Sequence, residues 1–478
     1  AVRQRRLART DTTSQANTTR QARTRRPRTP GQIQTDTTDV TTQLLRRWEI
    51  RGSLSFNKMR GFSRLLPIPM RIDQTTMKFN TNDITLTNAH LHLGKSDFML
   101  NGEINRIRQA MLRGGKLRGN FSLTSDYIDC NQLMKAMNSG MQYSEQHLAT
   151  TGQSVMDEES FVTMDTHTLQ DSIATATLDT TDRVFVIPAY LDITLHTNAQ
   201  KIDFKDAELT NVLGEVIIRD QSINLSNLKM DSNIGRGNMT MFYTAKDYSG
   251  ASVGFDLDME DVMVEKLIGL YPAIDTLVPM LRSFEGVVDC QVTATCKMDS
   301  TMSLELPSLH SACYLHGENM VLLDGETFTE ISKTLMFKNK KRNVIDSISV
   351  DLAIKDNKIK VFPFLVEMDR YKVAVGGTHN LDMTFNYHLS VLKSPVPFKL
   401  GIDITGNLDD FKYKIVKCRY KDLFKPAKEA ELDSTRTNVR KEIRESIRNQ
   451  IKETAPELVS SLSPNHTVTP PEGETNAL

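Results

Sequence analysis

The sequence lacks any run of about twenty apolar residues, which is the length that a transmembrane helix needs. It also lacks a recognisable signal peptide, and the chain begins at Ala1 rather than at Met. No segment of these 478 residues is therefore predicted to span a bilayer as a helix. We expect the chain to be a fragment or a processed product, from which an upstream membrane anchor could have been lost.

An excess of either charge is lacking too. The sequence has 59 Lys and Arg residues and 59 Asp and Glu residues. Proteins that bind nucleic acid carry an excess of basic side chains on one surface. The overall charge therefore gives no reason to expect a nucleic-acid partner.

Cysteine is scarce, and the five cysteines are Cys130, Cys290, Cys296, Cys313 and Cys418. An odd number without tight motif spacing argues against a disulfide framework. Cys290 and Cys296 belong to an apolar alternation that predicts one strand, which puts them on the same face, roughly 20 Å apart at about 3.3 Å per residue. A disulfide needs Cα atoms within about 7 Å, so we interpret both residues as small hydrophobic side chains.

Catalytic motifs are missing as well. The sequence has no glycine-rich phosphate loop, no nucleophile elbow and no histidine–glutamate zinc motif. His90 and His92 fall on the polar side of a predicted strand, where solvated histidines are expected. The carboxylates between Asp256 and Asp261 are predicted to cap the start of a helix. We therefore predict a protein that is not an enzyme and that has no cofactor and no metal site.

What the sequence has in abundance is apolar residues at every second position. From Leu381 to Val391 the odd-numbered residues are apolar and the even-numbered ones are polar. Successive side chains of a strand point to opposite faces, so each such strand has one apolar and one polar face. Turn residues separate these strands at short spacing, as in an antiparallel meander. The one clear helical pattern in this block lies between Val262 and Leu281. The apolar face must be covered either by a second sheet or by a lipid.

A short repeat indicates how the strands are arranged. Residues 84–91 (ITLTNAHL) are echoed by residues 223–230 (INLSNLKM), and more loosely from Ile359 to Met368. Repeated hairpins that cannot bury their own apolar faces stack along one axis. We therefore predict a mainly β fold, an elongated antiparallel β-groove of repeating hairpins forming an open, taco-like sheet, with a few short helices and disordered ends.

The two ends of the chain differ in composition from the strand blocks. The Arg/Thr-rich start has too few apolar side chains to order itself, so we predict a disordered linker, the alternative being contact with acidic lipid headgroups or nucleic acid. Apolar residues from Leu432 to Ile451 lie on one helical stripe, which favours docking on the chain's own sheet over pairing with a partner helix or lying on a membrane. The predicted segments are 1–47 (disordered linker), 48–137 (N-terminal β-groove segment), 138–183 (low-complexity flexible insertion), 184–420 (C-terminal β-groove) and 421–478 (charged amphipathic helix and disordered tail).

Several motifs together resemble the AsmA family, closest to its C-terminal region in proteins of the Bacteroidota. Residues 115–134 resemble that family's strand followed by S-x-x-(L/I)-D-x-N-x-L, and residues 187–230 resemble its P-x-x-(L/I)-x-(L/F) strand and the hairpin after it. Residues 284–286 (FEG) match its hydrophobic-E-G, and residues 361–364 (VFPF) resemble its (V/L)-x-P-F signature. The resemblance covers roughly residues 48–420 by the order and spacing of these motifs. Cys130 stands where the family more often has an aliphatic residue.

The resemblance implies a hydrophobic β-groove related in design to bridge-like lipid transfer proteins. It implies an envelope protein that lies in the periplasm of a Gram-negative bacterium, tethered to the inner membrane by a segment not in this chain. Phospholipids are the implied partners, with envelope proteins as possible further partners and no nucleic acid. The implied function is to bind and conduct phospholipids between the inner and outer membranes, supporting outer-membrane biogenesis. The alternative is a structural or adhesion β scaffold with a dry core, which acts through protein or glycan contacts.

The candidate lipid-binding residues are apolar positions of the alternating strands after residue 184. Their alternation alone does not distinguish a lipid-lined face from a dry sheet-on-sheet core. Methionine is frequent among them, which suits a surface that accepts variable chains. The candidates are Leu191, Ile193, Val216, Ile218, Ile223, Leu225, Met239, Met241, Phe255, Leu257, Val350, Leu352, Val373, Val375, Met383, Phe385 and Leu389.

Overall fold

The computed structural model describes most of the chain between residues 49 and 459. The predicted disorder of residues 1–47, of most of residues 138–183 and of the C-terminal tail lies outside the described residues. Those described are 49–64, 66–113, 115–151, 161–162, 184–204, 207–266, 284–323, 342–368, 371–380, 384–394, 399–407 and 410–459.

The described strands form a single, mostly antiparallel sheet, which confirms the predicted fold class. Consecutive strands pair with one another from β1 to β5 and from β8 onward to β21, with β14 beside β12. The strands are β1 (Arg51–Ser63), β2 (Leu66–Asn80), β3 (Ile84–Leu93), β4 (Ser96–Asn105), β5 (Leu117–Ser125), β6 (Ile128–Asp129), β7 (Phe161–Val162), β8 (Leu191–Phe204), β9 (Ala207–Arg219), β10 (Ser222–Ser232), β11 (Arg236–Asp247), β12 (Gly250–Met263), β13 (Phe284–Glu285), β14 (Val287–Asp299), β15 (His310–Leu323), β16 (Arg342–Lys355), β17 (Lys358–Met368), β18 (Tyr371–Asn380), β19 (Phe385–Lys393), β20 (Leu400–Gly406) and β21 (Phe411–Val416).

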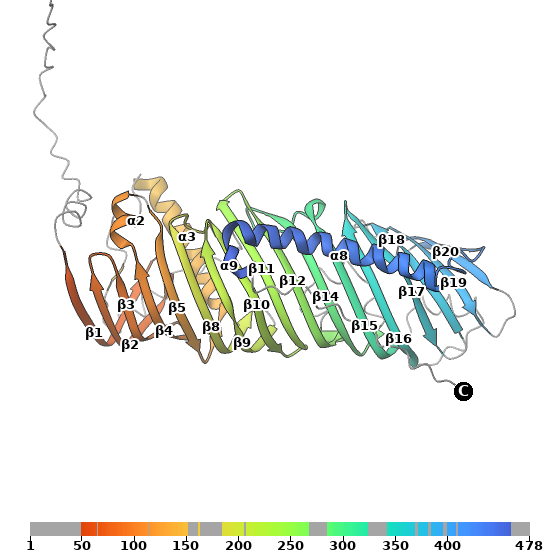
Figure 1. Cartoon of the computed structure of the whole chain (residues 1–478), viewed down its shortest axis with the longest axis horizontal. Helices are drawn as coiled ribbons and strands as arrows, with labels where there is room; N and C mark the ends of the chain where they lie inside the picture. Colours follow the sequence, from red (N-terminus) through yellow and green to blue (C-terminus); the bar gives the residue numbers. More distant parts are fainter. Residues whose placement is uncertain are drawn as a thin grey trace, which may run out of the picture.

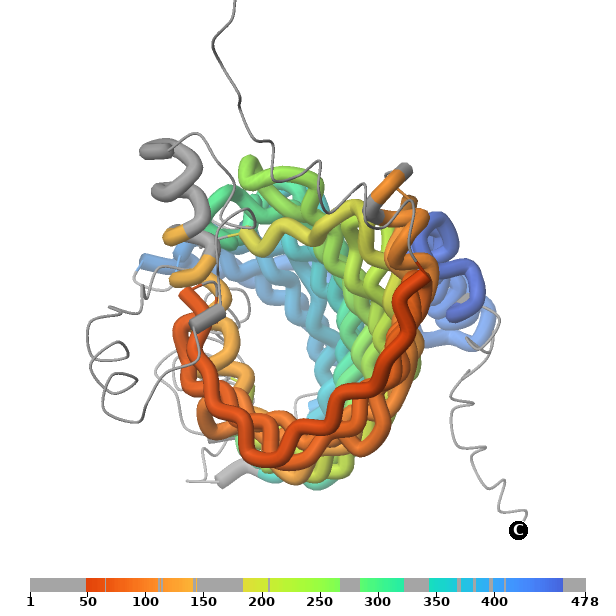
Figure 2. Tube along the Cα trace, turned by 90° about the vertical axis from the view of Figure 1, so that its left-hand side faces the viewer, coloured from red at the N-terminus to blue at the C-terminus, as the bar shows by residue number. Residues whose placement is uncertain are grey.

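The sheet has the shape of a long trough. Its strands lie side by side across the long axis of the molecule, from β1 at one end to β20 and β21 at the other (Figure 1). Seen along that axis, the strands curve so that the sheet bends back toward itself (Figure 2). The sheet therefore has an inner face, which lines the trough, and an outer face.

The strands bend at bulges that carry Asn or Asp. Asn88, Asn227 and Asp261 have φ values of 49°, 52° and 57°, and the strand register shifts beside each of them. These short polar residues tolerate the left-handed conformation, and a bulge bends its strand. Asn88 and Asn227 are the fifth residues of the two repeats seen in the sequence, so the repeat marks where the trough curves. Their backbone N–H groups, and that of Asp261, donate to side chains of the neighbouring strand, namely Asn101 Oδ1 (2.8 Å), Thr240 Oγ1 (3.3 Å) and Asp289 Oδ1 (3.2 Å).

Two parallel pairings, of β5 and of β6 with β8, interrupt the meander. A parallel neighbour requires a long crossover, and the described part of this connection contains α3 (Cys130–Thr151). α3 is 22 residues long. The prediction that a flexible insertion begins at residue 138 is wrong for residues 138–151, which continue α3. The sequence is compatible with this long helix, because Leu133 and Met137 lie four residues apart on one helical face and no proline interrupts the chain before residue 151.

A long C-terminal helix, α8 (Pro426–Thr454), lies along the outer face and ends in the short α9 (Pro456–Val459) (Figures 1 and 2). Ile443, Ile447 and Ile451 are buried against Ile217 of β9 and Phe242 of β11. The predicted docking of this helix on the chain's own sheet is confirmed. Two other short helices, α2 (Ile107–Arg113) and the 3₁₀ helix η3 (Leu306–Ser308), lie in connections between strands.

The helix predicted between Val262 and Leu281 needs correction at its start. β12 runs to Met263, so the Asp256–Asp261 carboxylates belong to a strand and do not cap a helix. Asp256 faces outward and pairs with Arg444 of α8 at 2.9 Å. Of the carboxylates that suggested a helix start, Asp256 thus pairs with a helix from elsewhere in the chain, whereas Asp261 pairs with Arg236 of β11. Residues 267–283 lie outside the described residues.

Candidate functional site

The strand register brings the candidate residues together on the inner face. Directly opposed residues of neighbouring strands share a face, and Ile193 opposes Ile218, which opposes Ile223. Ile217 and Phe242, which pack under α8, belong to the opposite, outer face. Applied strand by strand, this pairing puts on the inner face Leu191, Ile193, Val216, Ile218, Ile223, Leu225, Met239, Met241, Phe255, Leu257, Val350, Leu352, Val373, Val375, Phe385 and Leu389. Met383 lies outside the described residues.

These inner-face side chains are mostly half-buried. Of the described candidates, only Leu352 is fully buried, at 5% exposure. By contrast, under α8 Ile217 is 0% and Phe242 is 4% exposed. Large aliphatic side chains are usually fully buried in a globular core. The inner face therefore keeps a stripe of apolar surface that the chain itself covers in part.

The same face carries apolar residues that the candidate set omits. In the 184–420 segment, Leu195 opposes Val216 and Leu315 opposes Val350 across the strands. Val253 and Tyr387 lie two residues from Phe255 and Phe385 and so share their face. The stripe also continues into the first block of strands, through Met77, Phe79, Ile84, Leu86, Phe121 and Leu123. The signal for all of them was present as the same period-two alternation.

The covering of the inner face varies along the trough. Near the strand ends around β12–β16, Val262, Met320 and Ile345 are buried in one cluster. Nearer β8–β12, the segment beginning at Val184 packs across the inner face, and Tyr243 Oη accepts a hydrogen bond from the backbone N–H of Phe185 at 3.0 Å. Parts of the inner face are thus closed over, between stretches that remain partly exposed.

Two titratable groups on the inner face, Cys313 and Tyr387, remain uncharged near neutral pH. Contact with the Cys290 thiol, together with burial, raises the pKa of Cys313 well above its ordinary value. Burial raises the pKa of Tyr387 to about 12. A neutral thiol behaves as a small hydrophobic group. These residues therefore add to the apolar character of the face, and all five cysteines are free.

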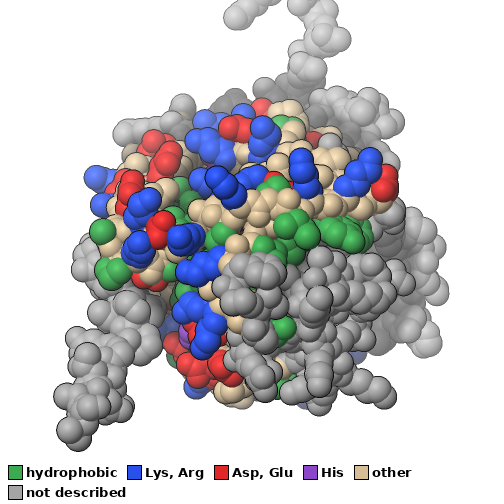
Figure 3. All heavy atoms as spheres, turned by 90° about the vertical axis from the view of Figure 1, so that its right-hand side faces the viewer, with side chains coloured by type: hydrophobic (Ala, Val, Ile, Leu, Met, Phe, Trp, Pro, Cys, Tyr) green, Lys and Arg blue, Asp and Glu red, His purple; other side chains and the backbone are tan. Residues whose placement is uncertain are grey.

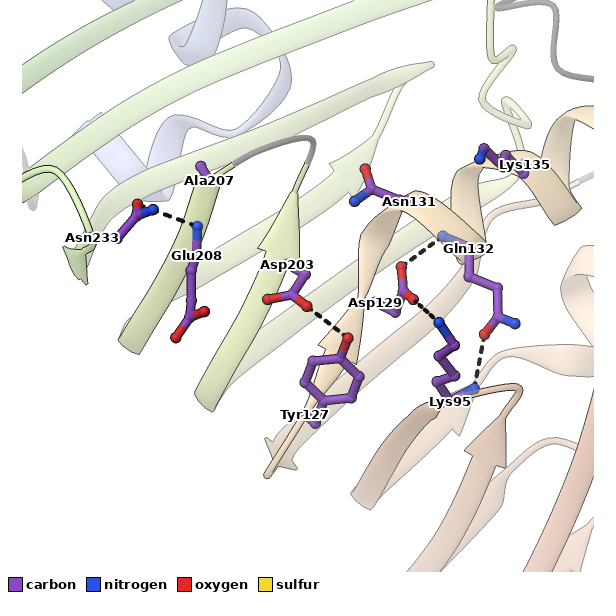
Figure 4. A pocket seen from close by; sticks show the side chains of 10 residues that line it. All are labelled: Lys95, Tyr127, Asp129, Asn131, Gln132, Lys135, Asp203, Ala207, Glu208 and Asn233. Carbon is purple, nitrogen blue, oxygen red and sulfur yellow. Dashed lines mark hydrogen bonds and ion pairs between the residues drawn. The ribbon is translucent and has the colours of Figure 1, made fainter. Parts of the chain in front are cut away.

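A polar pocket lies at one rim of the trough, where β3–β4, α3 and β8–β9 meet (Figure 4). Its volume is about 600 Å³. Tyr127 Oη donates to Asp203 at 2.7 Å, which raises the pKa of Tyr127 to about 12, and Lys95 pairs with Asp129 at 3.4 Å. Tyr127 and Asp129 stand on either side of Ile128 in the sequence, and Ile128 packs with apolar inner-face residues. The pocket therefore opens on the other side of the sheet. Its groups are largely paired with one another, which suits a structural role at the start of α3.

One buried cluster has the connectivity of a catalytic triad. His388 Nδ1 lies 2.6 Å from Asp403 Oδ1, and its Nε2 lies 2.9 Å from the Ser390 hydroxyl. In a hydrolase the serine must reach a substrate carbonyl, but Ser390 is fully buried. The same groups accept backbone N–H bonds from Arg419 and Tyr420, at 3.1 and 3.0 Å. The cluster thus fixes the corner at which the chain leaves β21 and turns toward α8.

Within the described part of the chain, no group of three His, Cys, Asp or Glu side chains is arranged to hold a metal ion. None of its helices combines the length and apolar character needed to cross a membrane. No protein-family model, no curated protein and no solved structure matches this chain.

Proposed function

We propose that the trough binds lipid acyl chains along its inner face and conducts phospholipids along its length. In this proposal the chain is a non-enzymatic envelope protein, similar to the AsmA family, that moves phospholipids between the inner and outer membranes. The observation that carries it is the partly exposed apolar inner face, opposite an outer face of which α8 covers a part.

Acyl chains are the occupants that such a face suits best. Each methylene group removed from water contributes about 0.8 kcal/mol, so about ten methylenes gain roughly 8 kcal/mol before the entropy of ordering is subtracted. The named lining residues carry no charge, so a bound acyl chain would not have to displace water from a charged group. Methionines such as Met239 and Met241 have flexible, polarisable side chains that adapt to variable chains. The headgroups would remain in water at the open mouth.

A dry scaffold that acts through protein or glycan contacts is the second candidate. The full burial of Leu352 and of the cluster around Val262 favours it, because these stretches have no room for a ligand. A scaffold of this kind would use its loops for binding. The two functions differ in whether lipid accompanies the purified protein.

Native mass spectrometry with lipid extraction tests the proposal. A variant with Met241→Asp and Phe385→Asp places two carboxylates on the inner face, where an acyl chain would have to desolvate them. We expect phospholipid to accompany the unchanged protein and to fall at least tenfold in this variant. Folding is checked by circular dichroism, since charge on a dry core would instead unfold the sheet.

The matched control adds the same number of carboxylates to the outer face. Ser252→Asp and Asn386→Asp change residues that alternate with Val253 and Phe385. This control should keep its lipid. Lipid-free, well-folded unchanged protein would instead support the dry scaffold, and equal lipid loss in both variants would contradict binding on the inner face.

A further inference from the structure

The trough ends in an exposed strand with two unlike faces. Among the described strands, β21 pairs only with β20, through one of its two edges. On its inner face Tyr413 and Ile415 are 50% and 62% exposed. On its outer face Lys412 and Lys414 are exposed. Apolar and basic side chains thus meet at one end of the molecule, the end that Figure 3 displays.

The basic character continues beyond the strand. Lys417 and Lys421 follow within a few residues and are also exposed. In the described part of the chain, neither these two nor Lys412 and Lys414 form an ion pair, whereas Arg419 pairs with Asp403 and Lys425 with Asp422. Four lysines are therefore free to interact with an external anionic surface.

Protection of a sheet edge explains only part of this arrangement. Lysines on an edge strand discourage pairing with other chains. Exposed Tyr413 and Ile415 have no place in that role, because large apolar side chains on an edge promote association. Aromatic and aliphatic side chains beside lysines are instead the combination that binds a lipid–water interface.

We propose that the β21 end of the trough docks on the surface of an anionic bilayer, with Lys412 and Lys414 at the headgroups and Tyr413 and Ile415 inserted beneath them. The inner face of the sheet would then meet the acyl region directly. An anionic bilayer is the partner that fits this end, because its lysines are positively charged and adjoin exposed apolar side chains. The inference rests on the proposed lipid function, since it gives the groove an exit into a membrane.

Vesicle flotation tests the docking. Vesicles of phosphatidylglycerol and phosphatidylcholine in equal parts are compared with phosphatidylcholine alone, at low and high salt. All chains carry Gln in place of every arginine within residues 1–47, so that the basic start does not contribute. Each lysine near an anionic surface strengthens binding about fivefold. Lys412→Gln with Lys414→Gln should therefore weaken binding about 30-fold.

The control is Lys355→Gln with Lys358→Gln, at the exposed β16–β17 turn. This control variant loses the same positive charge and should bind anionic vesicles as tightly as the reference chain does. Tyr413→Ser with Ile415→Ser should also weaken binding, including at high salt, where the lysine contribution is screened.

Three results would overturn the docking proposal: no binding of the reference chain to anionic vesicles, equal binding by both lysine variants, or self-association through β21 in place of vesicle binding. Lipid retained by the groove is measured on the same samples. Loss of vesicle binding with groove lipid retained refutes docking alone, and docking without groove lipid refutes the lipid conduit alone.

Discussion

Neighbouring residues in this sheet have opposite environments. Ile217 is buried beneath α8, whereas Ile218, one position later, is half-buried on the inner face. The difference follows from the alternation of side chains along a strand. A shift of one residue in register would exchange the two faces, so α8 and the inner face together specify the register of β9.

The positive φ at the bulges leads to a test at Asn88. This residue is exposed, and in its left-handed conformation glycine is unstrained while a β-branched residue clashes. Asn88→Val should lower the free energy of unfolding of the β1–β5 region by about 1–2 kcal/mol, and Asn88→Gly should leave it almost unchanged. Hydrogen exchange of β3 and β4 measures both. Equal losses of unfolding free energy in the two variants would show that Asn88 does not stabilise the sheet through its left-handed backbone conformation.

Two carboxyls near α8 predict an unusual pH dependence. Burial raises the pKa of Asp258 and of Asp351, despite the lowering effect of Arg444 on the first and of Arg436 and Arg440 on the second. Because the folded pKa exceeds the unfolded value of about 3.9, folding takes up protons. Their contribution to stability is full below about pH 3.9 and is lost as the pH rises through the raised values.

The docking of α8 on the sheet should therefore become no less stable, or more stable, when the pH is lowered slightly from neutral. Hydrogen exchange of the α8 amides, corrected for the intrinsic effect of pH, measures this. A helix held mainly by ordinary ion pairs would instead be released as its carboxylates become protonated. Faster corrected exchange at lower pH would contradict the account.

At the scale of elements, α8 connects strands that are far apart in the sheet. Arg440 donates to Asp351 of β16 at 2.7 Å and lies over the ring of Tyr314 of β15, while Arg444 pairs with Asp256 of β12. Near its end, Glu457 of α9 pairs with Arg219 of β9 at 2.6 Å. One helix thus bridges the outer face from β9 to β16 and stabilises the curvature of the sheet between them.

Removing one buried side chain of α8 should separate the helix from the sheet. Ile447 is 2% exposed, and Ile→Ala at a buried position costs about 2–5 kcal/mol. Ile447→Ala should therefore raise the exchange rates of α8 amides by about 100-fold while leaving the strand content unchanged. Ser446→Ala, at the adjacent exposed position, is the control. Unchanged exchange in the Ile447 variant would show that the apolar stripe does not hold the helix.

The elements could be predicted to different degrees. The strands and the docked helix follow from periodicities of two and of three to four residues, and both were recognisable in single segments such as Leu381–Val391 and Leu432–Ile451. The β5–β8 parallel pairing and the length of α3 were not, because a crossover pairs residues distant in sequence. The run from Asp256 to Asp261 was misread because its partner, Arg444, lies 188 residues away from Asp256.

For the whole molecule, the predicted open groove is confirmed as a fold, and the candidate inner-face residues lie together because the meander keeps its register over many strands. How much of that face remains exposed could not be predicted, because apolar and polar residues alternate in the same way whether the apolar face is covered or open. Met241 packs against the segment beginning at Val184, which crosses the trough, whereas Leu352 is buried with Leu309 and Ile359. The lipid function remains a proposal that rests on that exposure.

Photo-crosslinking at alternate positions tests the central claim most directly. A benzophenone amino acid is placed singly at Phe385, Asn386 and Tyr387 of β19, and at Met241 and Ser252 of β11 and β12, in cells labelled with radioactive phosphate. The account predicts lipid adducts at Phe385, Tyr387 and Met241 and none at Asn386 and Ser252, a period of two along β19. Adducts at no position, or equally on both faces, would contradict a lipid-binding inner face.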